Sequence, residues 1–156
     1  MTPGAGRSAN AIGVHDRLSA RYRTARRIDD RSEPTHQLVD RFLLGLQQAR
    51  LFTTGAVITE AFSFLAEVPH GPDRLASFLH HSATAVRDVF NDDGLDLAVR
   101  LMAKYADTPM DFSDATLVWL AEQTEIEQVL TLDRRGFSVF RFGRNRRFKL
   151  ALDGDL

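Results

Sequence analysis

The stretch MDFSDATLVWLAEQTEIEQVLTLDRRGF, residues 110–137, contains the clearest structural and chemical pattern of this chain. Its first half has the apolar spacing of a buried helix, and its second half contains a short β-branched run that predicts a strand. Asp111 and Asp114 stand at the start of the helix, and Asp133 directly ends the strand. Carboxylates at the ends of buried elements are costly unless a cation or a hydrogen-bond donor compensates them. The stretch therefore indicates a metal site.

Helical and strand patterns alternate outward from this stretch. Alternation of this kind is typical of an α/β fold with a largely parallel central sheet. The predicted helices cover residues 34–48, 55–68, 71–81, 91–106 and 112–123, and the predicted strands cover residues 49–54, 83–90, 127–133 and 137–142.

The N-terminal segment, residues 1–30, differs from the rest of the chain. It is rich in arginine and carries only isolated apolar residues, without a clear helical or strand period. We expect an atypical segment that is poorly ordered or forms a charged helix. The predicted domain covers residues 31–150, and residues 151–156 form a tail.

Composition narrows the class of protein. The chain has 156 residues, 44% of them hydrophobic and 26% charged, which is ordinary for one globular domain. Because it has no cysteine, disulfides and thiolate metal sites are excluded. No apolar run is long enough for a membrane span, and no secretory signal is visible. These features predict a cytoplasmic protein without a membrane partner.

Three acidic residues fall where a parallel sheet places its ligands, beyond the carboxyl ends of the strands. Asp133 ends one predicted strand, Asp114 lies in the first turn of a helix, and Glu60 lies in the helix after residues 49–54. Each has apolar neighbours that are expected to face the core. A cluster of such hard oxygen ligands is stabilised by Mg²⁺ or Mn²⁺, and such ions activate water for phosphodiester cleavage.

Each of these residues also has a simpler interpretation. Asp111 is a favourable helix N-cap, and Asp114 would favour the helix dipole from the first turn. Asp133 could start a turn, and Glu60 could be a partly exposed helix residue. Spacing alone leaves both interpretations open.

Four segments resemble the PIN-domain family of metal-dependent ribonucleases, which includes the VapC toxins of toxin–antitoxin pairs. The segments are DRSEPTHQ (30–37), TTGAVITEAF (53–62), MDFSDATLVWLAE (110–122) and VLTLDRRGF (129–137). The resemblance implies a three-layer fold and a Mg²⁺-dependent endoribonuclease that leaves a 3′-hydroxyl and a 5′-phosphate. It implies Glu60, Asp114 and Asp133 as catalytic metal ligands, with Asp111 in an outer position and Thr131 as a supporting hydroxyl. It further implies an RNA substrate, a small antitoxin partner and a homodimer.

One departure from the family pattern concerns the first strand, which in the family is apolar, central in the sheet and ends in a catalytic Asp. Counting back from residues 30–36 places this Asp near Arg21, where the sequence has neither an apolar run nor an acid. We therefore expect the first strand to be absent, as if the first 29 or so residues came from a wrong start or another reading frame. The alternative function is then a catalytically impaired remnant that binds RNA or a protein partner.

Basic residues are concentrated from Arg134 to Lys149, a segment without acidic residues. Arg134, Arg135, Arg141 and Arg144 are candidates for contacts with RNA phosphates. The alternative is that these arginines coat an edge strand, where charge discourages aggregation. The interleaved phenylalanines are expected to face the core.

Overall fold

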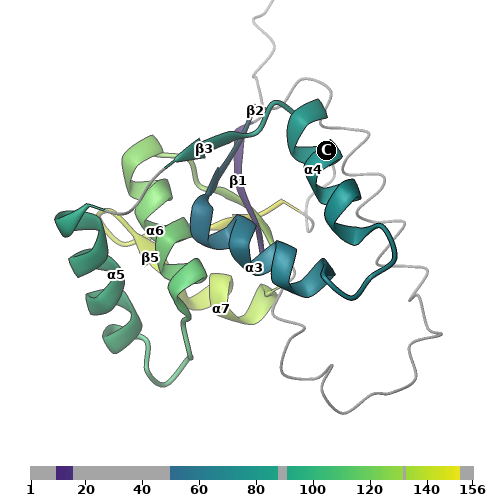
Figure 1. Cartoon of the computed structure of the whole chain (residues 1–156). Helices are drawn as coiled ribbons and strands as arrows, with labels where there is room; N and C mark the ends of the chain where they lie inside the picture. Colours follow the sequence, from purple (N-terminus) through teal and green to yellow (C-terminus); the bar gives the residue numbers. More distant parts are fainter. Residues whose placement is uncertain (1–9, 16–49, 88–90, 132, 152–156) are drawn as a thin grey trace, which may run out of the picture.

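The computed structural model describes residues 10–15, 50–87, 91–131 and 133–151 (Figure 1). The elements are β1 (Asn10–His15), β2 (Arg50–Thr54), α3 (Gly55–Leu65), α4 (Gly71–His81), β3 (Ala85–Arg87), α5 (Asp92–Lys104), α6 (Phe112–Thr124), β4 (Gln128–Thr131), α7 (Arg134–Val139), β5 (Arg141–Phe142), β6 (Arg146–Arg147) and β7 (Lys149–Leu150). The predicted helix over residues 34–48 lies outside the described residues. None of the described helices combines the length and the apolar character that crossing a membrane requires.

The strands form one five-stranded sheet in the order β3-β2-β1-β4-β7, in which every neighbouring pair is parallel. The α/β class with a parallel sheet is therefore confirmed. Strands β5 and β6 form a separate antiparallel hairpin. Helices α3, α4, α5 and α6 and strands β2, β3 and β4 begin and end close to the predicted positions.

The prediction that the first strand is absent was wrong. Strand β1 occupies the centre of the sheet, where Ile12 pairs with Phe52 of β2 on one side and with Val129 of β4 on the other. The register against β4 shifts between Ile12 and Val14, so Gly13 occupies a bulge. Gly13 interrupts the apolar residues of this strand, and its arginine-rich sequence context hides the pattern, so that its stability comes from backbone hydrogen bonds to both neighbours. The other residues of the segment 1–30 lie outside the described part of the chain.

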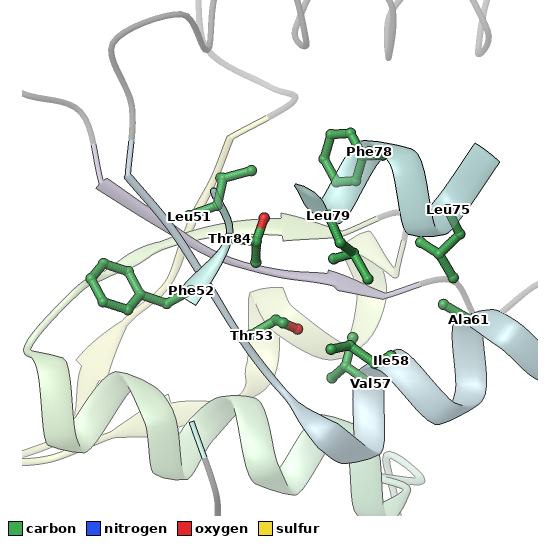
Figure 2. A pocket seen from close by; sticks show the side chains of 10 residues that line it. All are labelled: Leu51, Phe52, Thr53, Val57, Ile58, Ala61, Leu75, Phe78, Leu79 and Thr84. Atoms are coloured by element: carbon green, nitrogen blue, oxygen red, sulfur yellow. The ribbon is translucent and has the colours of Figure 1, made fainter. Parts of the chain in front are cut away.

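Helices cover both faces of the sheet. Successive side chains of β2 point to opposite faces. Leu51 and Thr53 line a small apolar cavity of about 20 Å³ that α3 and α4 close, as Figure 2 shows. On the other face, Thr54 hydrogen-bonds to Thr116 of α6, and Phe52 packs against the core that α6 dominates. The result is a three-layer arrangement with the sheet in the middle.

Helix α6 is the central element of the core. Its residues Ala115, Leu117, Val118, Leu120 and Ala121 are fully buried. A helix that is apolar around most of its circumference is covered on all sides, here by the sheet, α3 and α5.

The predicted closing strand over residues 137–142 was also wrong. Residues 134–139 form helix α7, only Arg141 and Phe142 of the predicted segment are in a strand, and β7 closes the sheet instead. Phe137 and Phe140 are fully buried, stack edge to face and are three residues apart. This spacing suits one face of a helix, and packing against Phe148 stabilises the helical alternative.

Candidate active site

The carboxyl ends of three strands meet at one edge of the sheet. His15, the last residue of β1, lies beside Thr131, the last residue of β4. Thr54 ends β2, the other neighbour of β1, and α3 begins immediately after it. Helix α7 follows β4 after two residues, so α3 and α7 both start at this edge. In parallel sheets this is the edge that binds ligands.

Asp114 is 0% exposed in the first turn of α6. It is part of a capping box: its Oδ2 accepts a hydrogen bond from the backbone N–H of Asp111 at 3.2 Å, and its own N–H donates to Oδ1 of Asp111 at 2.8 Å. Capping explains the Asp residues at both positions in part. The other oxygen of Asp114, Oδ1, is buried as well.

Asp111 itself is the N-cap of α6, which is the simpler of the two interpretations that the sequence allowed. Its Oδ1 accepts the capping hydrogen bond from the N–H of Asp114 at 2.8 Å.

Glu60 lies in the second turn of α3 and is partly buried, with its Oε2 shielded from solvent. The helix that carries it begins at the N-cap Thr54, whose hydroxyl oxygen accepts a hydrogen bond from the N–H of Val57 at 3.4 Å. The end of β2 therefore sets the direction in which α3 leaves the sheet.

A hydrogen bond of 2.7 Å between the hydroxyls of Thr54 and Thr116 joins the start of α3 to the first turns of α6. Thr116 donates its proton to the carbonyl of Ser113 at 2.7 Å, so Thr54 is the donor in the pair. Both threonines are fully buried. This pair holds the helices of Glu60 and Asp114 against each other. The sequence offered no signal for it beyond two threonines at buried positions.

Asp133 is the N-cap of α7, where its Oδ1 accepts a hydrogen bond from the N–H of Gly136 at 3.1 Å. The hydroxyl of Thr131 accepts a hydrogen bond from the N–H of Asp133 at 3.0 Å, which orients the aspartate at the end of β4. Oδ2 of Asp133 is buried. Gly136 is necessary here, because a Cβ at this position would lie 2.8 Å from the ring of Phe140 and would collide with Oδ2 of Asp133.

Glu60, Asp114 and Asp133 thus come from three elements that start at one sheet edge, and each buries one carboxylate oxygen. The oxygens are hard donors of the type that Mg²⁺ and Mn²⁺ prefer. In the part of the chain that the structure describes, however, no three His, Asp or Glu side chains form a group that could hold a metal ion. The shared metal site therefore stays a prediction.

The four predicted RNA-binding arginines differ in their surroundings. Arg134 and Arg135 are exposed beside Asp133, and Arg144 is exposed in the turn of the β5–β6 hairpin. Arg141 uses Nη1 to donate to the carbonyls of Ser138, Val139 and Phe140, at 2.9, 2.6 and 2.7 Å. Its guanidinium caps the C-terminal end of α7.

Glu127, which lies directly before β4 and away from the candidate site, has a lowered carboxyl pKa. The hydrogen bond from Lys149 holds the pKa of Glu127 below its ordinary value, and the positive charges of Lys149 and Arg146 act in the same direction. The Arg146–Glu127 pair measures 3.7 Å, and Lys149 contacts the other carboxylate oxygen. These contacts tie β7 and the hairpin to the start of β4.

No protein-family model matches the chain. It is, however, 30% identical over 114 residues to the ribonuclease VapC26 of Mycobacterium tuberculosis, a match that covers 72% of this chain and 83% of the relative. The chain belongs to the VapC family of PIN-domain proteins.

Proposed function

We propose that this protein is a metal-dependent endoribonuclease that acts as the toxin of a toxin–antitoxin pair. The observation that carries the proposal is the position of Glu60, Asp114 and Asp133, each with a buried oxygen, on three elements that start at one sheet edge. The ribonuclease activity named for the relative from Mycobacterium tuberculosis supports it. The substrate is RNA, and the second partner is a small antitoxin protein.

Glu60, Asp114 and Asp133 would hold Mg²⁺ or Mn²⁺, which when bound supplies a Lewis acid and lowers the pKa of a coordinated water. The chain contributes the orientation of these ligands. The cap orients Asp114, and Thr131 and Gly136 orient Asp133. Burial keeps solvent from the oxygens, so they interact more strongly with a cation than exposed carboxylates would.

Asp16 is the candidate for the first acidic residue of the family pattern. That pattern has an Asp at the end of its first strand, and Asp16 directly follows His15, the last residue of β1, in the sequence. Asp16 itself lies outside the described residues. The expected absence of the first strand was the reason for predicting that the first acidic residue is missing. Because β1 is present, that reason no longer holds.

Arg134 and Arg135 are the residues of this chain best placed to contact an RNA phosphate near Asp133, because both are exposed in the first turn of α7. Phosphate contacts of this type position the nucleic acid without reading its sequence. Arg141 has a structural role in this proposal, since its guanidinium caps α7.

Cleavage of RNA by the full-length chain, with Mg²⁺ and with a chelator, tests the proposal when wild type is compared with Asp114→Asn. We expect metal-dependent cleavage by the wild type and a loss of at least about a hundredfold in the variant. Asp73→Asn in α4 is the matched control, because Asp73 is exposed and belongs to none of the four motif segments. Cleavage that Asp114→Asn leaves unchanged would contradict the proposal.

The second candidate is a remnant that binds RNA or a protein partner without cleaving RNA. It is favoured by the finding that the described acidic residues form no three-ligand group. Calorimetric titration with Mn²⁺ separates the two candidates. The nuclease requires Mn²⁺ binding that Asp114→Asn weakens. The remnant does not require Mn²⁺ binding, and a separate RNA titration should give the same affinity with and without the metal.

A further inference from the structure

An open pocket of about 390 Å³ lies between helix α5, the end of α6 and the β5–β6 hairpin. Residues 97–104 of α5 form one wall, and Glu122 of α6 together with Arg141, Gly143 and Asn145 of the hairpin form the rest. Figure 1 shows α5, α6 and β5 next to one another. A volume of this size is sufficient for a small polar ligand or for one unit of a polymer.

Positive charge predominates in this pocket. Arg100 and Lys104 of α5 and Arg141 of the hairpin all line it. Arg100 and Lys104 are four residues apart, so they lie on the same face of the helix. The pocket also contains one carboxylate, Glu122, but in the part of the chain that the structure describes no ion pair joins it to any of the three cations. We call this site the basic pocket; its charge contrasts with the formal net charge of −1 of the whole chain.

Tyr105 holds two of the three cations in place. The Nζ of Lys104 lies 5.0 Å from the centre of the Tyr105 ring, which is a cation–π contact. The hydroxyl of Tyr105 accepts a hydrogen bond from the backbone N–H of Arg141 at 3.0 Å. Toward the described residues, the guanidinium of Arg141 donates through Nη1 alone, which caps α7. Its other N–H groups therefore remain for a ligand.

Glu122 fixes the opposite wall of the basic pocket. Its Oε1 accepts a hydrogen bond from the N–H of Gly143 at 3.1 Å, which holds the hairpin against α6. Gly143 and Asn145 have positive φ angles of 50° and 65°, so the hairpin turns sharply at this point. The carboxylate thus serves the hairpin and leaves the three cations without a compensating charge.

We propose that the basic pocket binds a phosphate group of the RNA strand other than the phosphate that is cleaved. The identity of the polymer rests on the proposed function, whereas the phosphate chemistry rests on the pocket itself. A guanidinium presents N–H groups in a planar fork that matches two phosphate oxygens, and an ammonium adds a mobile point charge. A bound phosphate would relieve the repulsion among Arg100, Lys104 and Arg141.

The basic pocket and the candidate active site lie at the two ends of α7. Asp133 caps the N-terminal end of this helix, and the guanidinium of Arg141 caps the C-terminal end. The six residues between them span about 9 Å. Stacked nucleotides advance about 3.4 Å each along a strand, so RNA bound at Asp133 reaches the basic pocket after about three nucleotides or more. A contact at this distance positions the strand without reading its sequence.

Fluorescence anisotropy of a labelled single-stranded RNA, measured with the full-length chain and a chelator, reports binding without cleavage. We expect Arg100→Gln and Lys104→Gln each to raise the dissociation constant about threefold or more and to reduce its logarithmic salt dependence by about 0.7, the value for one phosphate of a single strand. Both residues are exposed, so the substitutions should not disturb folding. Arg74→Gln, which removes the same charge from an exposed residue of α4, should bind RNA like wild type. Unchanged RNA affinity in both pocket variants would overturn the proposal.

Cleavage assays distinguish a failure of this proposal from a failure of the proposed function. Both pocket variants should cleave a short oligonucleotide, which does not extend beyond the candidate active site, at the wild-type rate, whereas the KM for a long RNA should rise. Loss of RNA affinity in the pocket variants of a protein that cleaves no RNA would support the basic pocket and contradict the nuclease. A mononucleotide whose binding depends on Arg100 and Lys104, while RNA affinity does not, would assign the pocket to a free phosphate ester and overturn its role toward RNA.

Discussion

Thr54 and Thr116, which are 62 residues apart in the sequence, share a buried hydrogen bond of 2.7 Å. Thr54 ends β2 and caps α3. Thr116 lies in the second turn of α6, two residues after Asp114. Two elements that each carry an acidic residue of the candidate site are therefore connected through a pair of neutral side chains. This connection is buried, so its loss leaves a polar group without access to water.

Thr116→Val should remove this connection and destabilise the protein by about 1–3 kcal/mol, because the hydroxyl of Thr54 is left buried with its donor unsatisfied. Urea denaturation measures the free energy of unfolding. Thr59→Val serves as the control, since Thr59 donates to the carbonyl of Gly55 on an exposed turn of α3 and should change stability by less than about 0.5 kcal/mol. Equal effects of the two substitutions would contradict the role given to the threonine pair.

Gly136→Ala should destabilise the protein by about 1–3 kcal/mol and displace Asp133. The added methyl group would lie 2.8 Å from the ring of Phe140 and would collide with a carboxylate oxygen of Asp133. Gly55→Ala is a matched control, because its Cβ would meet no atom within 4 Å. Thermal unfolding of both variants checks the stability. RNA cleavage should fall in Gly136→Ala and stay unchanged in Gly55→Ala.

Asp111→Ser separates capping from metal binding. Serine caps a helix nearly as well as aspartate, so the variant should lose less than about 1 kcal/mol of stability and keep its cleavage activity. Asp111→Ala should cost about 1 kcal/mol, since the N–H of Asp114 loses its acceptor. If the serine variant folds normally but loses Mg²⁺-dependent cleavage, Asp111 is a ligand and its interpretation as a cap is incomplete.

Asp16→Asn should abolish metal-dependent cleavage without changing the helical content that circular dichroism measures. The prediction follows from the position of Asp16 in the sequence, directly after the central strand β1. Asp29→Asn is a control in the same N-terminal segment and should cleave like wild type. Full activity of the Asp16 variant would mean that the first acidic residue of the family pattern has no counterpart at this position.

Glu127→Gln should lower stability by less than about 1 kcal/mol at neutral pH, because the pair with Lys149 and Arg146 is partly exposed and screened by solvent. The pKa of Glu127 is lowered from its ordinary value of 4.5 in the folded protein, so its ionised form stabilises the fold above that pH. The stabilisation is lost as pH falls through the lowered pKa. Urea titrations of both proteins from neutral to acidic pH should therefore converge at the acidic end.

Local sequence patterns predict the α/β class and the helices α3 to α6, because the apolar residues of these helices recur with a helical period. They also locate Asp114 in the first turn of a helix, where the capping hydrogen bonds are local, and Asp133 at the end of a strand.

Long-range contacts set three features that no local pattern predicts: the central position of β1, the helix over residues 134–139 and the Thr54–Thr116 pair. Each depends on partners that are far away in the sequence. The six residues of β1 are stabilised by strands on both sides, and the phenylalanines of α7 by packing against Phe148. Contacts of this kind leave little trace in a local pattern, because their free energy is gained only when the distant segments meet.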